Sequence, residues 1–459
     1  MSGQHGAGLG ELDGRRVVVL GLGSFGGGLG AVQWLCDQGA EVVVSDRLSL
    51  EELGPVATEA QRCGAKLLLG SHDGIDWNTE DVVVVNPAIP LDADPVMAAR
   101  EKDAMVTCEF ALVLERWPGP VIGVTGSNGK TTTAMLASVL LREAGAEVAL
   151  GGNLGGSLLA SLSDATAKTI AVVELSSFML EGLERQGLGP DVAIITNVTP
   201  NHLDRHGSFE NYLAAKKAIL LRARGAVMST EDESSRSLLN EFSGEVSWFG
   251  EGGKWAPSSD GDLVNEVGEV IVRNRDIPLL GRANRMNLAA GLAGVEMITG
   301  KPWGESVAPA MKNYSPPPHR MERVDSKGDV VWIDDSASTT PESTAATLEA
   351  IGRPCVLIAG GRDKGLDPTP LFEAASLMAK CVLTIGETGR GLSEKLQTLG
   401  VETHSVGTVE EAVSVAARIS KTGDVVLFSP GYSSHDQFQD FRSRGHRYVK
   451  EVLVQSEGS

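Results

Sequence analysis

The sequence predicts an α/β protein of three domains, each built on a mostly parallel sheet covered by helices. Short runs such as Val17–Leu20 and Val82–Val85 are apolar throughout, as expected for parallel strands buried on both faces. The chain has 459 residues, a length typical of about three domains. Its 55 glycines and its low aromatic content of 5% suit many tight strand-to-helix turns.

The first segment opens with a strand and a glycine-rich turn. Arg16–Leu20 leads into Gly21, Gly23 and Gly26, which form the pattern Gly-x-Gly-x-x-Gly. The next predicted strand, Glu41–Asp46, ends in an acid about 20 residues further on, as a ribose contact would. This pattern predicts a Rossmann-like domain. From the residues alone, the turn could hold NAD, the ribose and phosphates of another nucleotide, or no ligand.

A second glycine-rich loop stands between the apolar run Val121–Val124 and a helical pattern over Ala134–Leu141. Its sequence, T-G-S-N-G-K-T-T, is a compact form of the phosphate loop, with Val124 where the strict pattern has its first glycine. Backbone N–H groups and the helix N-terminus favour an anion here, and a Thr hydroxyl can bind Mg²⁺. We expect these residues to hold a nucleoside triphosphate: Gly126, Ser127, Asn128, Gly129, Lys130, Thr131 and Thr132.

Further along the chain, three separate residues carry groups that suit a phosphate site. Glu174 ends the apolar strand Ile170–Glu174, which would place its carboxylate at the sheet edge as a Mg²⁺ ligand. His202 follows a strand ending near Asn197, and Lys216 lies on an Ala-rich helix. Read alone, the histidine is structural and the lysine is a surface residue. The polar stretch 229–278 predicts β-hairpins and loops rather than a separate domain.

The third segment begins after the proline run at 315–318, which marks a boundary. It again contains apolar runs that predict buried parallel strands, namely Val330–Asp335, Cys355–Ala359, Cys381–Ile385 and Asp424–Phe428. We therefore expect three domains over residues 1–108, 109–315 and 316–459.

The charge, apolar runs and cysteines of the chain exclude several classes of function. A net charge of −20 argues against a nucleic-acid partner and against attraction to an anionic membrane surface. No apolar run reaches the roughly 18 residues of a membrane span. The five cysteines show no C-x-x-C pair and no metal-binding spacing, which is typical of a reducing compartment.

Together these motifs resemble the Mur ligases, the ATP-dependent enzymes that add amino acids in peptidoglycan synthesis. The resemblance covers Val17–Leu453. Its most specific parts are T-G-S-N-G-K-T-T at 125–132, E-L-S-S-F at 174–178 and N-V-T-P-N-H-L-D-R-H at 197–206. The run S-P-G-Y-S-S-H-D-Q-F-Q-D-F-R-S-R-G at 429–445 resembles the branch that adds glutamate to UDP-N-acetylmuramoyl-L-alanine.

The resemblance implies a Rossmann-like N-terminal domain for the UDP substrate, a central P-loop ATPase domain and a Rossmann-like C-terminal domain for the amino acid. It implies ATP and two Mg²⁺ ions as cofactors, with Lys130 at the phosphates and with Lys216 carbamylated. The metal ligands would be Thr131, Glu174, His202 and the Lys216 carbamate, and the nucleotide contacts would include Asn284, Asn287, His319, Arg320 and Asp335.

The same resemblance implies the partners. Glutamate would be held by Thr339, Lys364, Ser434 and Phe441, and the UDP-sugar by Ser24, Phe25, Asp46, Asn153 and Ser176. The Gly-x-Gly-x-x-Gly turn would then bind UDP rather than NAD. We expect a cytoplasmic monomer with no nucleic-acid partner and no membrane span.

The chain departs from the family pattern in three places. Ala337 replaces the lysine of D-S-K-A-T, Met179 replaces the glutamine that commonly follows E-L-S-S-F, and Gly26–Gly28 alter the first-domain loop. These changes leave L-glutamate or another amino acid open as the substrate. Also open are a folylpolyglutamate-synthase-like ligase and a non-catalytic nucleotide-binding relative. An NAD-dependent enzyme would leave the phosphate loop unexplained.

Overall fold

The computed structural model describes residues 10–23, 26–79, 81–324, 326 and 328–457, so the predicted UDP contacts Ser24 and Phe25 lie outside the described residues. The chain forms two compact units. The first unit contains Met1–Arg273 and Met286–Asn313, and the second contains Asn274–Arg285 and Tyr314–Ser459. The domain limits at residues 108 and 315 stay a prediction.

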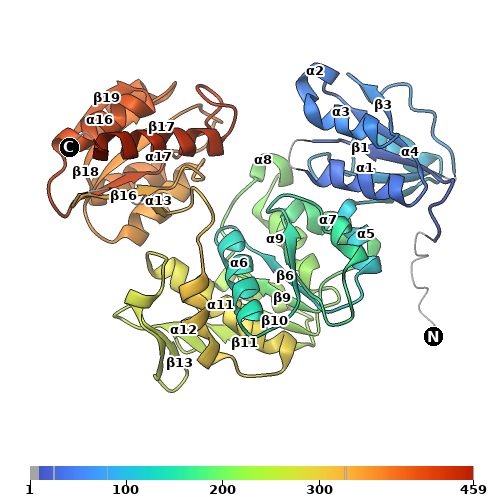
Figure 1. Ribbon diagram of the computed structural model, residues 1–459, viewed down its shortest axis with the longest axis horizontal. Helices are drawn as coiled ribbons and strands as arrows, with labels where there is room; N and C mark the ends of the chain where they lie inside the picture. The colour runs from blue at the N-terminus through green and yellow to red at the C-terminus, as the bar shows by residue number, and fades with distance from the viewer. Residues whose placement is uncertain (1–9, 24–25, 80, 325, 327, 458–459) are drawn as a thin grey trace. The chain divides into compact units, whose positions relative to one another are not determined.

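The N-terminal sheet of the first unit is wholly parallel, with the strand order β3-β2-β1-β4-β5 (Figure 1, blue). Its strands are β1 (Arg16–Leu20), β2 (Glu41–Asp46), β3 (Lys66–Leu69), β4 (Val82–Val85) and β5 (Met105–Thr107). The helices of this segment are α1 (Gly27–Asp37), α2 (Leu50–Leu53), α3 (Pro55–Arg62) and α4 (Asp94–Glu101). The sheet confirms the predicted parallel architecture, and the carboxyl end of β1 carries the glycine-rich turn.

The central sheet has nine strands in the order β14-β13-β12-β11-β10-β9-β6-β8-β7 (Figure 1). Its parallel part runs from β12 to β7, and the pairs β12–β13 and β13–β14 are antiparallel. These antiparallel pairs confirm the hairpins predicted for 229–278. The strands are β6 (Val121–Thr125), β7 (Val148–Gly152), β8 (Ile170–Glu174), β9 (Val192–Ile195), β10 (Gly225–Ser229), β11 (Glu245–Phe249), β12 (Trp255–Pro257), β13 (Leu263–Asn265) and β14 (Val270–Val272).

The helices around the central sheet position the site residues. They are α5 (Glu109–Arg116), α6 (Lys130–Glu143), α7 (Ser177–Gln186), α8 (Leu203–His206), α9 (Phe209–Lys217), α10 (Glu233–Arg236), α11 (Arg282–Thr299) and α12 (Gly304–Asn313). Helix α6 starts at the carboxyl end of β6, and α7 follows β8 after two residues. Because β6 lies between β8 and β9, the ends of these three strands meet at one sheet edge.

The second unit contains a six-stranded sheet in the order β15-β16-β20-β17-β18-β19. Only β15 is antiparallel to its neighbour. The strands are β15 (Glu322–Val324), β16 (Val331–Asp334), β17 (Cys355–Gly360), β18 (Ala379–Ile385), β19 (Thr403–Gly407) and β20 (Val425–Phe428). The helices are α13 (Pro341–Ile351), α14 (Thr369–Met378), α15 (Gly389–Thr398), α16 (Val409–Ile419) and α17 (Phe441–Glu457).

The predicted apolar strands form the buried centre of each sheet. Strands β4, β6, β8, β9, β17 and β20 are buried along their whole length. This burial is the physical reason why the sequence predicted them well. Each helix in the described part of the chain is too short or too polar to traverse a bilayer.

Candidate active site

The loop between β6 and α6 has a backbone that requires glycine at two positions. Gly126 and Gly129 have φ angles of 149° and 81°. A Cβ atom on Gly126 would lie 1.9 Å from the Thr196 hydroxyl oxygen, and one on Gly129 would lie 2.2 Å from the Asn287 amide oxygen. Both positions therefore exclude any side chain, and the loop backbone packs directly against its neighbours.

Hydrogen bonds from the end of β9 fix this loop. The Ser127 backbone N–H donates to the Asn197 carbonyl oxygen at 2.8 Å. The Asn128 backbone N–H donates to the Asn197 side-chain oxygen at 3.0 Å. Thr196 donates through its hydroxyl to the Asn128 carbonyl oxygen at 2.6 Å. The loop is thus held in place by protein contacts, as a preformed anion cradle requires.

Lys130 is the first residue of α6 and bends back over the loop. Its ammonium donates to the carbonyl oxygens of Gly126 at 2.9 Å and Ser127 at 2.8 Å. No acidic residue lies in the first turn of α6, so the helix N-terminus keeps its partial positive charge. A full charge and a helix N-terminus therefore coincide at the loop, as phosphate binding requires.

Glu174 links two other site residues at the end of β8. It is 2% exposed, and one carboxylate oxygen accepts a 2.7 Å hydrogen bond from the Thr131 hydroxyl. The other oxygen accepts a 2.8 Å bond from the Asn153 side-chain amide. A hydroxyl and a carboxylate this close to a phosphate loop match the oxygen ligands that Mg²⁺ prefers. The residues present therefore fit a Mg²⁺ ion.

Lys216 is buried beneath the same loop. Read alone, the sequence predicts a surface lysine at this position. Lys216 is 1% exposed. Its ammonium donates to the Gly126 carbonyl oxygen at 2.9 Å and to the Thr125 hydroxyl at 3.3 Å, and lies 4.6 Å from the centre of the Tyr212 ring. Burial, followed by the positive charge of Lys130, lowers the pKa of Lys216 well below its usual value. The neutral amine is thereby favoured.

His202 occupies a different environment from the buried residues. It is the exposed N-cap of α8, with a positive φ of 53°, and its ring lies 5.2 Å from the Phe178 ring. The neighbouring His206 is buried instead, and its ring contacts the Ser177 hydroxyl at 2.9 Å and the Glu181 carboxylate at 3.2 Å. Of the two histidines in this motif, His202 is the one accessible to a ligand.

Asp46 is the last residue of β2, and its carboxylate holds the glycine-rich turn of the first domain by hydrogen bonds to the backbone. One carboxylate oxygen accepts a 2.8 Å bond from the Leu22 backbone N–H, and the other accepts a 2.9 Å bond from that of Leu48. The acid therefore joins two loops at the sheet edge. Ser176, also predicted on the UDP side, is the N-cap of α7 and accepts a bond from the Met179 backbone N–H.

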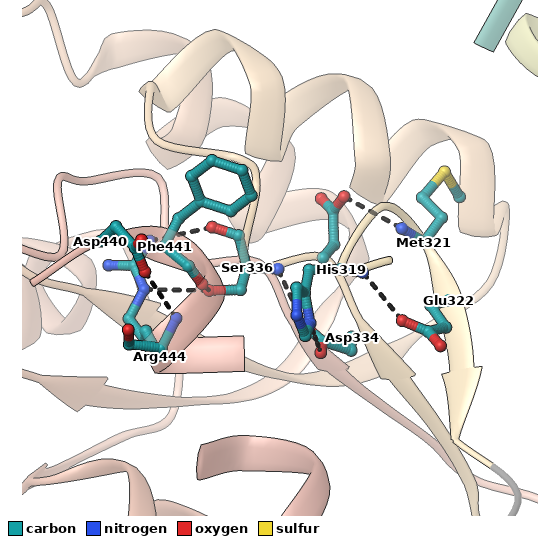
Figure 2. Close-up of polar contacts among 10 residues, drawn as sticks. His319, Met321, Glu322, Asp334, Ser336, Asp440, Phe441 and Arg444 are labelled. Atoms are coloured by element: carbon teal, nitrogen blue, oxygen red, sulfur yellow. Dashed lines mark hydrogen bonds and ion pairs between the residues drawn. The ribbon is translucent and has the colours of Figure 1, made fainter. Parts of the chain in front are cut away.

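His319 forms a buried pair with Asp334 in the second unit (Figure 2). Its ring Nδ1 lies 2.7 Å from the Asp334 carboxylate, and its backbone N–H donates to Glu322. Burial lowers the pKa of His319, but the hydrogen bond and charge of Asp334 outweigh this effect and hold the pKa above its usual value. The pair thus favours a charged imidazole, which suits contact with an anion.

Asp335 faces inward rather than toward solvent. Its carboxylate accepts hydrogen bonds from the hydroxyls of Ser338 at 2.6 Å, Thr347 at 2.7 Å and Ser429 at 2.8 Å. Burial raises its pKa above the usual value. Arg320 is exposed, beside the buried His319. The side chain of Asp335 therefore ties β16, α13 and β20 together.

The residues predicted to hold glutamate come from the loops at one edge of the C-terminal sheet. Thr339 follows β16, Lys364 follows β17, Ser434 follows β20, and Phe441 begins α17. Ser434 is 3% exposed and Lys364 is exposed. Partial desolvation of the Lys364 ammonium, followed by the positive charge of Arg444, lowers the pKa of Lys364.

Asn287 and Asn284 lie on successive turns of α11. Asn287 lies against Gly129 of the phosphate loop within the first unit. Asn284 donates a 2.8 Å bond to the Leu280 carbonyl oxygen within the second unit. Both side chains are 7% exposed.

Sequence reasoning missed three residues that hold the site together. Thr125 contacts Lys216, Asn197 anchors the phosphate loop, and Arg444 is buried beside Ser336. The first two lie inside motifs that the sequence analysis quoted, and Arg444 lies in the R-G pair of the C-terminal run. Position in these motifs is the signal that could have found them.

Two family models match parts of this chain. A family model described as the Mur ligase middle domain matches residues 124–295. A second model, described as the Mur ligase glutamate ligase domain, matches residues 319–431. The first match contains the phosphate loop, Glu174, His202 and Lys216, and the second contains His319 and Lys364.

Relatives match over nearly the whole chain. The UDP-N-acetylmuramoylalanine–D-glutamate ligase of Roseiflexus sp. (strain RS-1) is 34% identical over 96% of this chain and 99% of its own. The enzyme of the same name from Geotalea daltonii is 32% identical over 98% of this chain and 99% of its own. The solved structure of UDP-N-acetylmuramate-alanine ligase from Thermotoga maritima has a TM-score of 0.63 at 20% identity, covering 96% of this chain and 99% of that chain, which supports the fold. The chain therefore belongs to the Mur ligase family of ATP-dependent ligases.

Proposed function

We propose that this Mur ligase joins D-glutamate to UDP-N-acetylmuramoyl-L-alanine in peptidoglycan synthesis, in the cytoplasm and as a monomer. The observation that carries the proposal is the set of Lys130, Thr131, Glu174 and Lys216 around one preformed phosphate loop. The near full-length similarity to D-glutamate ligases supports the choice of substrates.

The first chemical step is activation of a carboxylate. The carboxylate oxygen of UDP-N-acetylmuramoyl-L-alanine attacks the γ-phosphorus of ATP, ADP leaves, and an acyl phosphate forms. Lys130 and the N-terminus of α6 stabilise the charge on the phosphates. Thr131, Glu174 and His202 would hold Mg²⁺ at two sites. When bound, Mg²⁺ neutralises charge on the transferring phosphoryl group.

Lys216 would act as a carbamate in this reaction. A neutral amine attacks CO₂ and loses a proton, which gives an anionic carbamate on the lysine nitrogen. The lowered pKa of Lys216 supports this role, because it increases the fraction of neutral amine. A carbamate beneath the loop would turn a cation into an oxygen ligand for Mg²⁺.

The second step forms the amide. The glutamate amine attacks the acyl phosphate carbonyl, and the tetrahedral intermediate expels phosphate. Thr339, Lys364, Ser434 and Phe441 would bind the incoming amino acid, and His319, Arg320, Asp335, Asn284 and Asn287 would contact ATP. Asp46, Asn153 and Ser176 would lie on the UDP-sugar side, with the turn at Gly21–Gly26.

A second candidate differs only in the amino acid. Ala337 occupies the position of the motif lysine, so a cation near the incoming substrate is replaced by a methyl group. This observation favours L-glutamate or another amino acid as an alternative to D-glutamate.

The test is phosphate release that depends on ATP, UDP-N-acetylmuramoyl-L-alanine and D-glutamate together. Lys130→Ala should abolish it, with a loss of at least about 10³-fold, because the charge at the phosphates is removed. Lys168→Ala, an exposed lysine on the same unit, is the control and should retain full activity. Activity retained in Lys130→Ala would contradict the proposed ATP site.

A further inference from the structure

Three side chains near two neighbouring strands of the second unit bring metal-binding atoms together. Cys381 lies on β18, Glu402 directly precedes β19, and His404 lies on β19 (Figure 1). One ligand atom from each, namely the cysteine sulfur, a carboxylate oxygen and a ring nitrogen, lies within 4.8 Å of the other two. The spacing of the cysteines gives no sign of this group, because only one of its members is a cysteine.

The pairing of β18 with β19 explains why these side chains meet. The two strands are parallel, with Val382 opposite Thr403. Cys381 is therefore opposite Glu402, and the Val382 backbone N–H donates to the Glu402 carbonyl oxygen at 2.8 Å. Because side chains alternate along a strand, Cys381, Glu402 and His404 project from the same face of the sheet.

The neighbouring contacts agree with this face. The Thr403 hydroxyl lies 2.7 Å from that of Ser393 on α15, which packs on the other face. Cys381 is 4% exposed and belongs to the apolar cluster that includes Val413 and Ala416 of α16. The thiol is therefore buried under α16, whereas Glu402 and His404 reach it from the solvent side.

One other group of this kind occurs within the residues that the structure describes. It consists of His319, Glu322 and Asp334. Its members already bind one another, since Asp334 lies 2.7 Å from the His319 ring and Glu322 accepts from the His319 backbone N–H. That group is part of the site described above, so it is not a separate metal site.

The ligand types at Cys381 favour zinc over magnesium. Zn²⁺ binds thiolate sulfur, imidazole nitrogen and carboxylate oxygen, whereas Mg²⁺ takes oxygen ligands. The ligand atoms of a tetrahedral Zn²⁺ lie about 3.5 Å apart. The Glu402 carboxylate and the His404 ring already lie 3.3 Å apart. A small rotation of these two exposed side chains would bring the Cys381 sulfur to the same distance.

The charges of the three groups also suit a divalent cation. A thiolate and a carboxylate together balance the two positive charges of Zn²⁺, and a neutral imidazole adds none. Burial, followed by the negative charge of Glu402, raises the pKa of the Cys381 thiol to about 11. The thiol proton therefore passes to solvent as the Zn–S bond forms.

We propose that Cys381, Glu402 and His404 form a Zn²⁺ site that fastens β19, the edge strand of the sheet, to β18. An edge strand has a backbone partner on one side only, so a metal link adds a constraint that its outer side lacks. The side chains of Glu402 and His404 are 68% and 47% exposed, so the fourth position of the ion would take a water.

This site lies away from the proposed chemistry of the ligase. Cys381 and Glu402 lie near the amino ends of their strands, whereas the residues predicted to bind glutamate follow the carboxyl ends of β16, β17 and β20. The inference therefore goes beyond the proposed function and does not depend on it.

The test is Zn²⁺ binding to the full chain in Mg²⁺ buffer, measured by competition with a chromophoric chelator. Cys381→Ala, Glu402→Gln and His404→Gln should each raise the Zn²⁺ Kd at least about 100-fold, since a residue that only supports a ligand costs roughly 10–100-fold. Cys355→Ala is the control for the thiol, because Cys355 is also buried but belongs to the apolar cluster on the other face of the sheet.

Glu394→Gln is the control for the carboxylate, because Glu394 is exposed and pairs with Arg390 on α15. Both control variants should bind Zn²⁺ as the unmodified chain does.

Two further measurements distinguish this site from the Mg²⁺ site at the phosphate loop. Co²⁺ in place of Zn²⁺ should give a thiolate-to-metal charge-transfer band, which requires a cysteine ligand. The band should vanish in Cys381→Ala and persist in Cys355→Ala. Zn²⁺ should also slow hydrogen exchange of the β19 amides in the unmodified chain but not in His404→Gln.

Equal Zn²⁺ Kd values for the unmodified chain, Cys381→Ala and His404→Gln would overturn the proposal. A Co²⁺ complex without the charge-transfer band would also overturn it. If Cys381→Ala does not fold, His404→Gln decides the question, because His404 is exposed. Phosphate release with the ligase substrates is a separate measurement, so its failure would count against the proposed function alone.

Discussion

The hydroxyl of Thr131 donates a 2.7 Å hydrogen bond to the carboxylate of Glu174 across the edge of the central sheet. Thr131 lies on α6 after β6, and Glu174 ends β8, so the contact follows from the pairing of these two parallel strands. In the pairing, Val124 is opposite Glu174. The strand register therefore brings the nucleotide loop and its acidic partner together before any ligand binds.

Glu174→Gln should weaken the response to Mg²⁺. The amide removes the negative charge while keeping the shape, so the Mg²⁺ concentration needed for half-maximal phosphate release should rise about 10–100-fold. Glu147→Gln is the control, because Glu147 is exposed and its carboxylate accepts hydrogen bonds from the hydroxyls of Thr166 and Thr169, away from the phosphate loop. An unchanged Mg²⁺ titration in Glu174→Gln would show that this carboxylate is not a ligand.

Gly129→Ala should impair ATP binding, whereas Gly145→Ala should not. Both glycines flank α6 and have similar φ angles of 81° and 79°. A Cβ atom at Gly129 would meet the Asn287 side chain at 2.2 Å, but one at Gly145 would meet nothing within 4 Å. Gly145→Ala should therefore lower the free energy of unfolding by only about 1 kcal/mol, because a residue with a Cβ atom is disfavoured at a positive φ angle. We expect the KM for ATP to rise at least about tenfold in Gly129→Ala alone.

If the Tm fell by the same amount in both variants and the KM for ATP stayed constant, backbone strain would explain the effect. The close approach of Asn287 would then not matter. Measuring Tm and the KM for ATP on the same preparations distinguishes these outcomes.

Lys216→Ala should be inactive and should regain part of its activity with short carboxylic acids that can occupy the place of the carbamate. Lys217→Ala is the control, since the side chain of Lys217 is 42% exposed and pairs with Glu241. Because the pKa of Lys216 is lowered, CO₂-depleted enzyme should recover on bicarbonate addition, and faster as pH rises toward that pKa. Full activity without CO₂ and no rescue by acids would contradict the carbamate.

Glu109→Gln should stabilise the protein at alkaline pH. Burial raises the pKa of Glu109 to about 7, and its carboxylate accepts a 2.5 Å hydrogen bond from the Ser157 hydroxyl. The folded state therefore binds the proton more tightly than the unfolded state, and stability falls as pH rises between the usual value and about 7. Because the residue keeps some exposure, we expect a gain of about 1–3 kcal/mol at pH 8.

This gain should disappear at about pH 4, below the usual pKa of 4.5, where the carboxyl is protonated in both the folded and the unfolded state. Denaturant unfolding of both proteins at the two pH values measures it. A constant difference at both pH values would show that ionisation of Glu109 is not the cause.

The strands and the phosphate loop were predictable because their signals are local. An apolar run such as β8 is recognised from five consecutive residues, and the glycines of the loop are required by its backbone. The sequence also placed Glu174 correctly at the end of a strand. Its partners Thr131 and Asn153 depend on strand order, which no local pattern contains.

The environment of charged residues was harder to predict. Lys216, read alone in the sequence, looks like a surface residue but is 1% exposed in the structure. Asp46 was predicted from its spacing as a substrate contact, and its carboxylate bonds to the backbones of Leu22 and Leu48. Burial of such groups results from packing between distant segments, so it can be read only from the fold.

The central claim is tested most directly by phosphate release from ATP with UDP-N-acetylmuramoyl-L-alanine, when D-glutamate and L-glutamate are offered separately. We expect release with D-glutamate and little with L-glutamate, which would make Ala337 a tolerated change. Release with L-glutamate alone would tie Ala337 to a changed substrate. No release with either amino acid would contradict the proposed function.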